Sequence, residues 1–174
     1  VKLDAMMSVL PYYTRLGMAA LLPHKTLEMT DEFKVLTDGL PCDDLKQREG
    51  ILQSYVPNSR CVQFDDIKMM KRADLRQIFN GMEVVYIYHN QIDARGDKQN
   101  TENEVFGACT EAIEEIYSLI KRLSVDVNTL HFVVTADHGF IYKRDKLNES
   151  DKIGGVVNKG AFVNRRFIVS HSAV

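Results

Sequence analysis

The residues best suited to carry out chemistry are Asp137, His138 and Gly139, which stand together two residues after an apolar run. A carboxylate and an imidazole offer an oxygen and a nitrogen ligand to a divalent metal ion. The glycine lets the backbone turn sharply and approach the ion. Taken alone, however, the tripeptide is more simply explained as the end of a strand with a solvated Asp–His pair.

Asp93 and Asp97 form a second polar cluster. They lie in residues 89–100, a polar stretch that is predicted to be a loop. Two carboxylates four residues apart, bent around a glycine, can converge on one cation, although a plain polar loop has the same composition. Arg95 between them is suited to hold a phosphate oxygen or to pair with the aspartates. The cluster is therefore a candidate metal site.

Thr14 is the candidate nucleophile. It stands at the start of a helix predicted over residues 14–22, where a hydroxyl ordinarily serves as an N-cap. A helix start also favours an anionic phosphate and a developing negative charge. Because a hydroxyl needs a metal ion or a base to become nucleophilic, this hypothesis depends on the metal ligands. Without them, capping is the simpler explanation.

The elements that must position these residues alternate between strands and helices. Apolar runs at 84–88 and 130–134 predict two strands buried on both faces. Between them, a capping box at Thr101 and Glu104 and helical spacing up to Leu123 predict a long helix. This βαβ pattern predicts a parallel sheet with both polar clusters at its carboxyl edge, where ligands bind. Further helices are predicted at 44–55 and 72–80, and further strands at 33–36, 61–64 and 167–169.

The bulk composition excludes several classes of protein. The chain has 174 residues, a net charge of -2 and 45% hydrophobic residues, as expected for one globular domain. The charge provides no basic field for nucleic acid, and no apolar run has membrane-spanning length. Three cysteines without a CxxC pair favour a reducing, cytoplasmic setting. Both ends have the composition of structured sequence, so we expect residues 1–174 to be part of a longer protein.

Three blocks of sequence resemble the alkaline-phosphatase superfamily and, more closely, the PglZ family of bacterial phage-defence systems of the BREX type. They are SVLPYYTRLGMAALLPH at 8–24, YIYHNQIDARGD at 86–97 and TADHGF at 135–140. The similarity spans most of the chain, and three blocks in order are more specific than any one of them. The resemblance implies an α/β fold with a mostly parallel sheet flanked by helices, of which this chain is a partial domain.

The resemblance also implies roles for the candidate residues. Thr14 occupies the nucleophile position, Asp137 and His138 match a pair that binds one metal ion, and Asp93 matches an aspartate of the other metal site. The implied mechanism is an in-line attack of Thr14 on phosphorus, after which water releases the phospho-enzyme. The expected substrate is a phosphate mono- or diester.

Asp97 departs from the pattern, because many superfamily members have histidine there. Divalent metal ions are implied, with zinc as the first expectation, but an all-oxygen site would favour magnesium or manganese. The early metal-binding aspartate has no counterpart before Thr14, and His171 is a candidate for a further ligand. These departures motivate an alternative, a non-catalytic scaffold that binds other proteins of the defence system. A third hypothesis is a nuclease, which the charge does not indicate.

Overall fold

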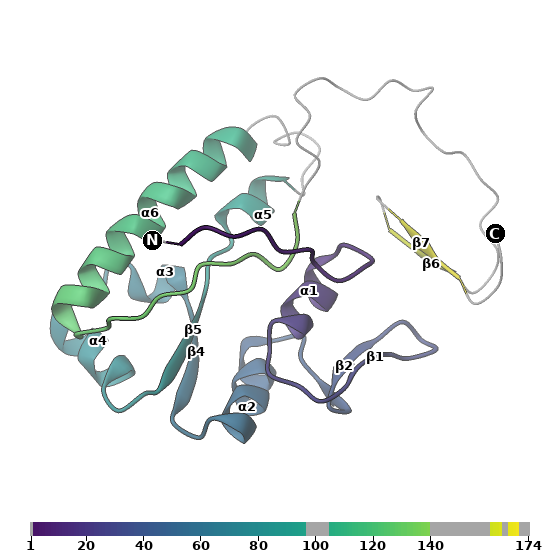
Figure 1. Cartoon of the computed structure of the whole chain (residues 1–174), viewed down its shortest axis with the longest axis horizontal. Helices are drawn as coiled ribbons and strands as arrows, with labels where there is room; N and C mark the ends of the chain where they lie inside the picture. Colours follow the sequence, from purple (N-terminus) through teal and green to yellow (C-terminus); the bar gives the residue numbers. More distant parts are fainter. Residues whose placement is uncertain (1, 97–104, 140–160, 165–166, 171–174) are drawn as a thin grey trace. The chain divides into compact units, whose positions relative to one another are not determined.

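A computed structural model describes residues 2–96, 105–139, 161–164 and 167–170. These residues belong to two compact units, and Figure 1 labels the helices and strands that they contain. Unit 1 takes residues from the ranges Val1–Pro41 and Ala136–Val174, and unit 2 comprises residues from Cys42–Thr135. Both units contain helices and strands, which confirms the predicted α/β class. No helix among the described residues is long and apolar enough to cross a membrane.

Unit 2 is built around a parallel pair of strands, β4 (Ser59–Gln63) and β5 (Val84–Tyr88). Cys61 lies opposite Tyr86 in their register. The connection between them runs through two helices, as a parallel pair requires. The helices of unit 2 are α2 (Leu45–Tyr55), α3 (Phe64–Ile67), α4 (Arg72–Phe79), α5 (Gln91–Gly96) and α6 (Val105–Asp126).

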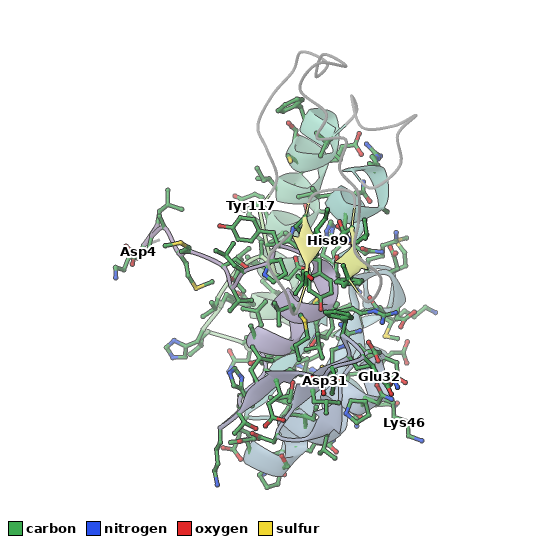
Figure 2. The ribbon with its side chains drawn as sticks, turned by 90° about the vertical axis from the view of Figure 1, so that its right-hand side faces the viewer. Asp4, Asp31, Glu32, Lys46, His89 and Tyr117 are labelled. Carbon is green, nitrogen blue, oxygen red and sulfur yellow. The ribbon has the colours of Figure 1, made fainter. Side chains whose placement is uncertain are left out.

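The core of unit 2 joins the strands to the helices that follow them. Leu75 of α4 and Leu123 of α6 are almost fully buried, together with Ile67 of α3. Leu119 and Leu123 stand four residues apart and therefore share one face of α6. The opposite face is open to solvent, where Tyr117 projects outward (Figure 2). The amphipathic pattern of α6 thus explains how the helix covers the core.

Helix α2 begins at a capping box. Asp44 accepts a hydrogen bond from the backbone N–H of Gln47 at 2.8 Å, and the Gln47 side chain accepts one from the Asp44 N–H. This pairing satisfies N–H groups that the first turn of a helix leaves without partners. Ile51 and Leu52 bury the inner face of the helix. The predicted helix at 44–55 is confirmed, and its start follows from the Asp-x-x-Gln pattern.

Unit 1 contains the helix α1 (Thr14–Ala20) and two small antiparallel sheets. Asp38 and Gly39 form the turn between β2 and β3 with φ angles of 50° and 74°, a conformation that glycine adopts without strain. The Asp38 carboxylate also accepts hydrogen bonds from the backbone N–H groups of Lys25 and Thr26, both at 2.8 Å. The strands are β1 (Leu27–Met29), β2 (Val35–Thr37), β3 (Leu40–Pro41), β6 (Phe162–Val163) and β7 (Ile168–Val169).

The predicted strand at 130–134 is wrong. These residues form no regular element, and Leu130, Val133 and Val134 are exposed rather than buried. His131, which we would expect in the core, is exposed as well. The predicted βαβ unit across the long helix is therefore not formed. The parallel pair instead joins β4 to β5, because among the described residues no strand pairs with the 130–134 segment.

The predicted loop at 89–100 is also wrong over the part that the structure describes. Residues 91–96 form α5, and side chains of α5 bind α6: Gln91 and Arg95 donate to the Glu111 carboxylate at 3.0 and 2.7 Å. This tertiary contact stabilises a helix that is too short to be stable alone. The capping box predicted at 101–104 lies outside the described residues.

Candidate active site

Thr14 is the first residue of α1, and Tyr13 occupies the N-cap position in an extended conformation. The Tyr13 ring packs between Phe162 and Phe167, with ring centroids 5.7 and 5.5 Å away. This aromatic cluster anchors the start of α1 within unit 1. Because the helix begins one residue earlier than N-capping by Thr14 would require, capping does not explain this threonine.

The Thr14 hydroxyl lies 3.3 Å from Nε2 of His138, although 124 residues separate them in the sequence. The other ring nitrogen of His138, Nδ1, lies 2.9 Å from the carbonyl oxygen of Gly139. A carbonyl can only accept, so Nδ1 carries the proton. In the neutral imidazole, Nε2 then has a lone pair that faces the Thr14 hydroxyl, and it can accept a proton or bind a metal ion.

Asp137 is held through its backbone, while its carboxylate stays available. The Ser8 hydroxyl donates to the Asp137 carbonyl at 2.7 Å. The Asp137 carbonyl group also packs directly against Gly17 of α1, which has no side chain to keep it away. Oδ2 of the carboxylate is buried and accepts no hydrogen bond from the residues that the structure describes, and it lies 3.6 Å from Nε2 of His138. A buried carboxylate oxygen without a donor is costly.

These donors suit a divalent metal ion. The unsatisfied Oδ2 of Asp137 and the lone pair on Nε2 of His138 lie side by side, and oxygen and nitrogen together form a ligand set that zinc accepts. The hydrogen bond from Nδ1 to a backbone carbonyl is the usual second contact of a metal-bound histidine. Among the residues that the structure describes, however, no group of three or more His, Cys, Asp or Glu side chains is placed to hold an ion. The pair therefore provides two ligands of the four that zinc takes.

Sequence reasoning missed two residues that support this pair. Ser8 and Gly17 both contact the Asp137 carbonyl group, and both lie in the first block of sequence that resembles the PglZ family. Glycine is less favourable than alanine inside a helix, so a glycine there indicates that another group packs too closely for a side chain. Gly17 was therefore detectable from sequence as a position of close approach, whereas a single serine before the helix gave no signal.

The structure describes Asp93 but not Asp97. Asp93 lies in the first turn of α5 in unit 2, half-buried, whereas Asp97 and the further candidate His171 lie outside the described residues. Arg95 pairs with Glu111 and lowers the pKa of that carboxyl by hydrogen bonding and by its charge. The predicted second metal cluster thus stays a prediction, and the role of Arg95 within unit 2 is to fix α5 to α6.

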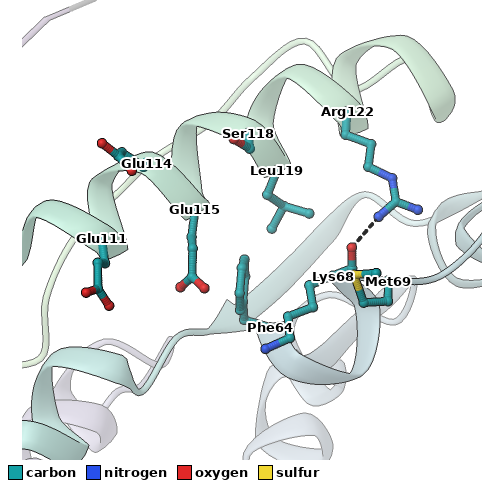
Figure 3. Close-up of a pocket in the computed structure, with 9 residues that line it drawn as sticks. All are labelled: Phe64, Lys68, Met69, Glu111, Glu114, Glu115, Ser118, Leu119 and Arg122. Carbon is teal, nitrogen blue, oxygen red and sulfur yellow. Dashed lines mark hydrogen bonds between the residues drawn. The ribbon is translucent and has the colours of Figure 1, made fainter. Parts of the chain in front are cut away.

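Unit 2 has its own polar groups at the carboxyl ends of β4 and β5. His89 follows β5, and its Nε2 lies 2.8 Å from the Glu115 carboxylate of α6, while its ring forms a T-shaped contact with the Phe64 ring at a centroid distance of 4.6 Å. Beside it, Phe64, Leu119 and Arg122 help to line an open pocket of about 400 Å³ between α3 and α6 (Figure 3). The pocket contains none of the candidate residues, so it does not define their site.

The chain matches known proteins over its full length. The family model described as "BREX system PglZ alkaline phosphatase-like domain" matches residues 1–174. The chain belongs to this PglZ family. It is 42% identical over 166 residues to the alkaline phosphatase-like protein PglZ of Bacillus cereus (strain H3081.97). It is 36% identical over 177 residues to the alkaline phosphatase-like protein BrxZ of Escherichia coli O9:H4 (strain HS).

These alignments cover 95% and 98% of this chain but only 19% and 20% of the relatives. The chain therefore spans about a fifth of the length of the proteins it matches. No solved structure shows a significant match. The relationship identifies the domain family, and the recognition made from the three sequence blocks is confirmed.

Proposed function

We propose that this chain carries part of the active site of a metal-dependent phosphate-ester hydrolase in a bacterial phage-defence system, with Thr14 as the nucleophile. The observation that carries the proposal is the contact between the Thr14 hydroxyl and Nε2 of His138, beside a buried Asp137 oxygen that accepts no hydrogen bond within the described part of the chain. Membership of an alkaline phosphatase-like family supports the same chemistry.

In the proposed reaction, Asp137 and His138 hold one divalent metal ion, with zinc as the first expectation and manganese or magnesium as alternatives. The ion, when bound, supplies positive charge that lowers the pKa of a nearby hydroxyl and neutralises phosphate oxygens. The Thr14 hydroxyl loses its proton to solvent, its oxygen attacks phosphorus as the ester oxygen leaves, and water then cleaves the threonine phosphate and restores the hydroxyl. The Gly139 carbonyl keeps the His138 proton on Nδ1, so that the lone pair on Nε2, beside the Thr14 hydroxyl, is left to bind the ion.

Asp93 and Asp97 are proposed as ligands of a second metal ion. Family resemblance supports Asp93, and Asp97 is supported only by its spacing from Asp93. In unit 2, Asp93 lies on a helix that Arg95 and Gln91 fix to α6, so its backbone is held in place. We also propose a cytoplasmic location and other proteins of the BREX system as partners.

The test is hydrolysis of p-nitrophenyl phosphate and bis-p-nitrophenyl phosphate by the full-length polypeptide with zinc, manganese or magnesium. Thr14→Ala and Asp137→Ala should each lower the rate at least roughly 1,000-fold, because each removes a part of one catalytic unit. Thr110→Ala, which removes an exposed threonine on α6, is the matched control and should retain the activity. Activity that survives both site substitutions would refute the assignment.

A non-catalytic scaffold is the second candidate function, and the aspartate at position 97 motivates it. The two functions make different predictions in the same assay. A scaffold would show no hydrolysis with any of the three metals, although the wild-type chain and both variants are folded. A nuclease would instead require hydrolysis of DNA or RNA, with binding that weakens steeply as salt is added.

A further inference from the structure

The face of α6 that points away from the core carries large apolar side chains of its own. Ile113 and Tyr117 are 69% and 58% exposed, and Figure 2 shows Tyr117 projecting from the helix. Ile120 continues the same face and is half-buried. A helix that meets only water on its outer face carries polar and charged residues there. The three apolar side chains therefore indicate a surface that another element covers.

The residues of this face follow the spacing of a coiled-coil seam. Steps of four and three residues alternate along α6, which keeps the side chains on one stripe when two helices pack lengthwise. Such a stripe favours a second helix as the partner. We call these residues the outer stripe of α6; each is exposed or half-buried, and they are Phe106, Thr110, Ile113, Tyr117, Ile120 and Ser124.

Two opposite charges border the outer stripe on the same side. Glu114 directly follows Ile113, and Lys121 directly follows Ile120 seven residues later. Both charged residues are exposed. Nζ of Lys121 lies 4.4 Å from the centre of the Tyr117 ring, so the lysine lies against the stripe. In coiled coils, charges at these flanking positions determine which helix is the partner and in which direction it runs.

We propose that the outer stripe of α6 pairs with the outer stripe of a second copy of the chain, with the two helices antiparallel. A two-fold axis beside Tyr117 places Glu114 of each copy opposite Lys121 of the other, so both opposite-charge pairs form together. A parallel pair would instead set glutamate level with glutamate and lysine level with lysine. This order of charges is complementary to itself, which is why a second copy fits better than an unrelated helix. The pairing does not depend on the proposed function.

Cysteine cross-linking in the full-length polypeptide tests the geometry. Residue 117 lies next to the proposed axis, so Tyr117→Cys should join two copies by a disulfide in a glutathione buffer. Thr110→Cys is the matched control, because residue 110 lies on the same stripe but roughly 22 Å from its counterpart in the antiparallel pair. The proposal expects a covalent dimer, above the wild-type background and lost on reduction, from Tyr117→Cys alone. Cross-linking at both positions indicates a parallel pair, and cross-linking at neither means that another part of the polypeptide covers the stripe. Either result overturns the proposal.

Charge reversal tests the choice of partner without relying on any single variant. Glu114→Lys and Lys121→Glu each set like charges against each other in the proposed dimer. By sedimentation of the full-length polypeptide, the dissociation constant of each variant should be at least about tenfold higher than that of the wild type. An equimolar mixture of the two variants restores both opposite-charge pairs and should associate as the wild type does.

Three outcomes of the sedimentation experiment contradict the proposal. The first is a wild type that stays monomeric at every concentration. The second is association of the single variants that equals that of the wild type, which would mean that the charges do not meet. The third is a mixture that associates no better than its components, since the matched pair would then give no gain.

Discussion

Gly17→Ala should destabilise unit 1, although alanine is normally the better helix former. Gly17 lies inside α1 and is buried against Asp137. A methyl group there would overlap the carbonyl oxygen of Asp137 and lie 2.7 Å from its carbonyl carbon, well inside the roughly 3.5 Å at which carbon atoms pack. Since the obstacle is backbone, no side-chain rotation relieves the overlap. Either α1 or the Asp137 segment must move.

Two terms of opposite sign set the magnitude. Alanine gains about 1 kcal/mol over glycine in a helix interior. Overpacking by one methyl group costs about 1–3 kcal/mol, and a rigid backbone obstacle places this site in the upper part of that range. The expected net change is a loss of about 1–2 kcal/mol in the free energy of unfolding. A shift of α1 or of the Asp137 segment should also increase the distance between the Thr14 hydroxyl and Nε2 of His138. The rate of hydrolysis should fall as a result.

Urea unfolding followed by circular dichroism measures this change. With a slope of about 2 kcal/mol per molar urea, the middle of the usual range, the midpoint should fall by about 0.5–1 M. Gly50→Ala and Gly107→Ala are matched controls, because each glycine lies in a helix and a methyl group there meets nothing within 4 Å. In both controls the free energy of unfolding should rise by about 0.5–1 kcal/mol. If Gly17→Ala raised the midpoint as the controls do, the close packing of α1 on Asp137 would be refuted.

Three further predictions concern unit 2. Leu75→Ala should lower the free energy of unfolding, measured by heat or urea, by about 2–5 kcal/mol, because removal of a fully buried side chain leaves a cavity. A loss below about 1 kcal/mol would contradict the described core. Asp44→Ala should cost about 1 kcal/mol by removing the cap of α2, and an unchanged midpoint would show that the cap is dispensable. Burial raises the pKa of Cys61 from 9.0 to about 11. The unfolded thiol therefore loses its proton first, and stability should fall as pH rises from about 9 to 11. The free energy of unfolding should fall less steeply with pH in Cys61→Ala than in the wild type. An equally steep fall in both proteins would show that the buried thiol is not its cause.

Strands and helices were predictable where the local pattern and the tertiary environment agree. The apolar run at 84–88 became β5, with a parallel neighbour and helices packed around it. The run at 130–134 also contains strand formers, but it has no partner strand among the described residues and stays irregular. Both runs favour a strand locally, so non-local pairing contributes to the difference. Such pairing is what β-propensity largely reflects.

The residue types of the candidate site were predictable, but their geometry was not. The residue types of Asp137 and His138 are enough to predict metal ligands. The prediction that Thr14 is a nucleophile depends on the resemblance to a family. That the Thr14 hydroxyl meets Nε2 of His138 is a contact across 124 residues, which no local pattern encodes. The tautomer of His138 is likewise fixed by the Gly139 carbonyl and had no signature in the sequence.

The most direct test of the central claim is to trap the phosphorylated enzyme. The full-length polypeptide would be mixed with p-nitrophenyl phosphate and metal, quenched in acid within the first turnover, and digested for mass spectrometry. We predict a phosphoryl group on Thr14 in the wild type and its absence from Thr14→Ala and Asp137→Ala. Rapid hydrolysis with no phosphoryl group on Thr14, and with an undiminished rate in Thr14→Ala, would contradict the nucleophilic role of this residue.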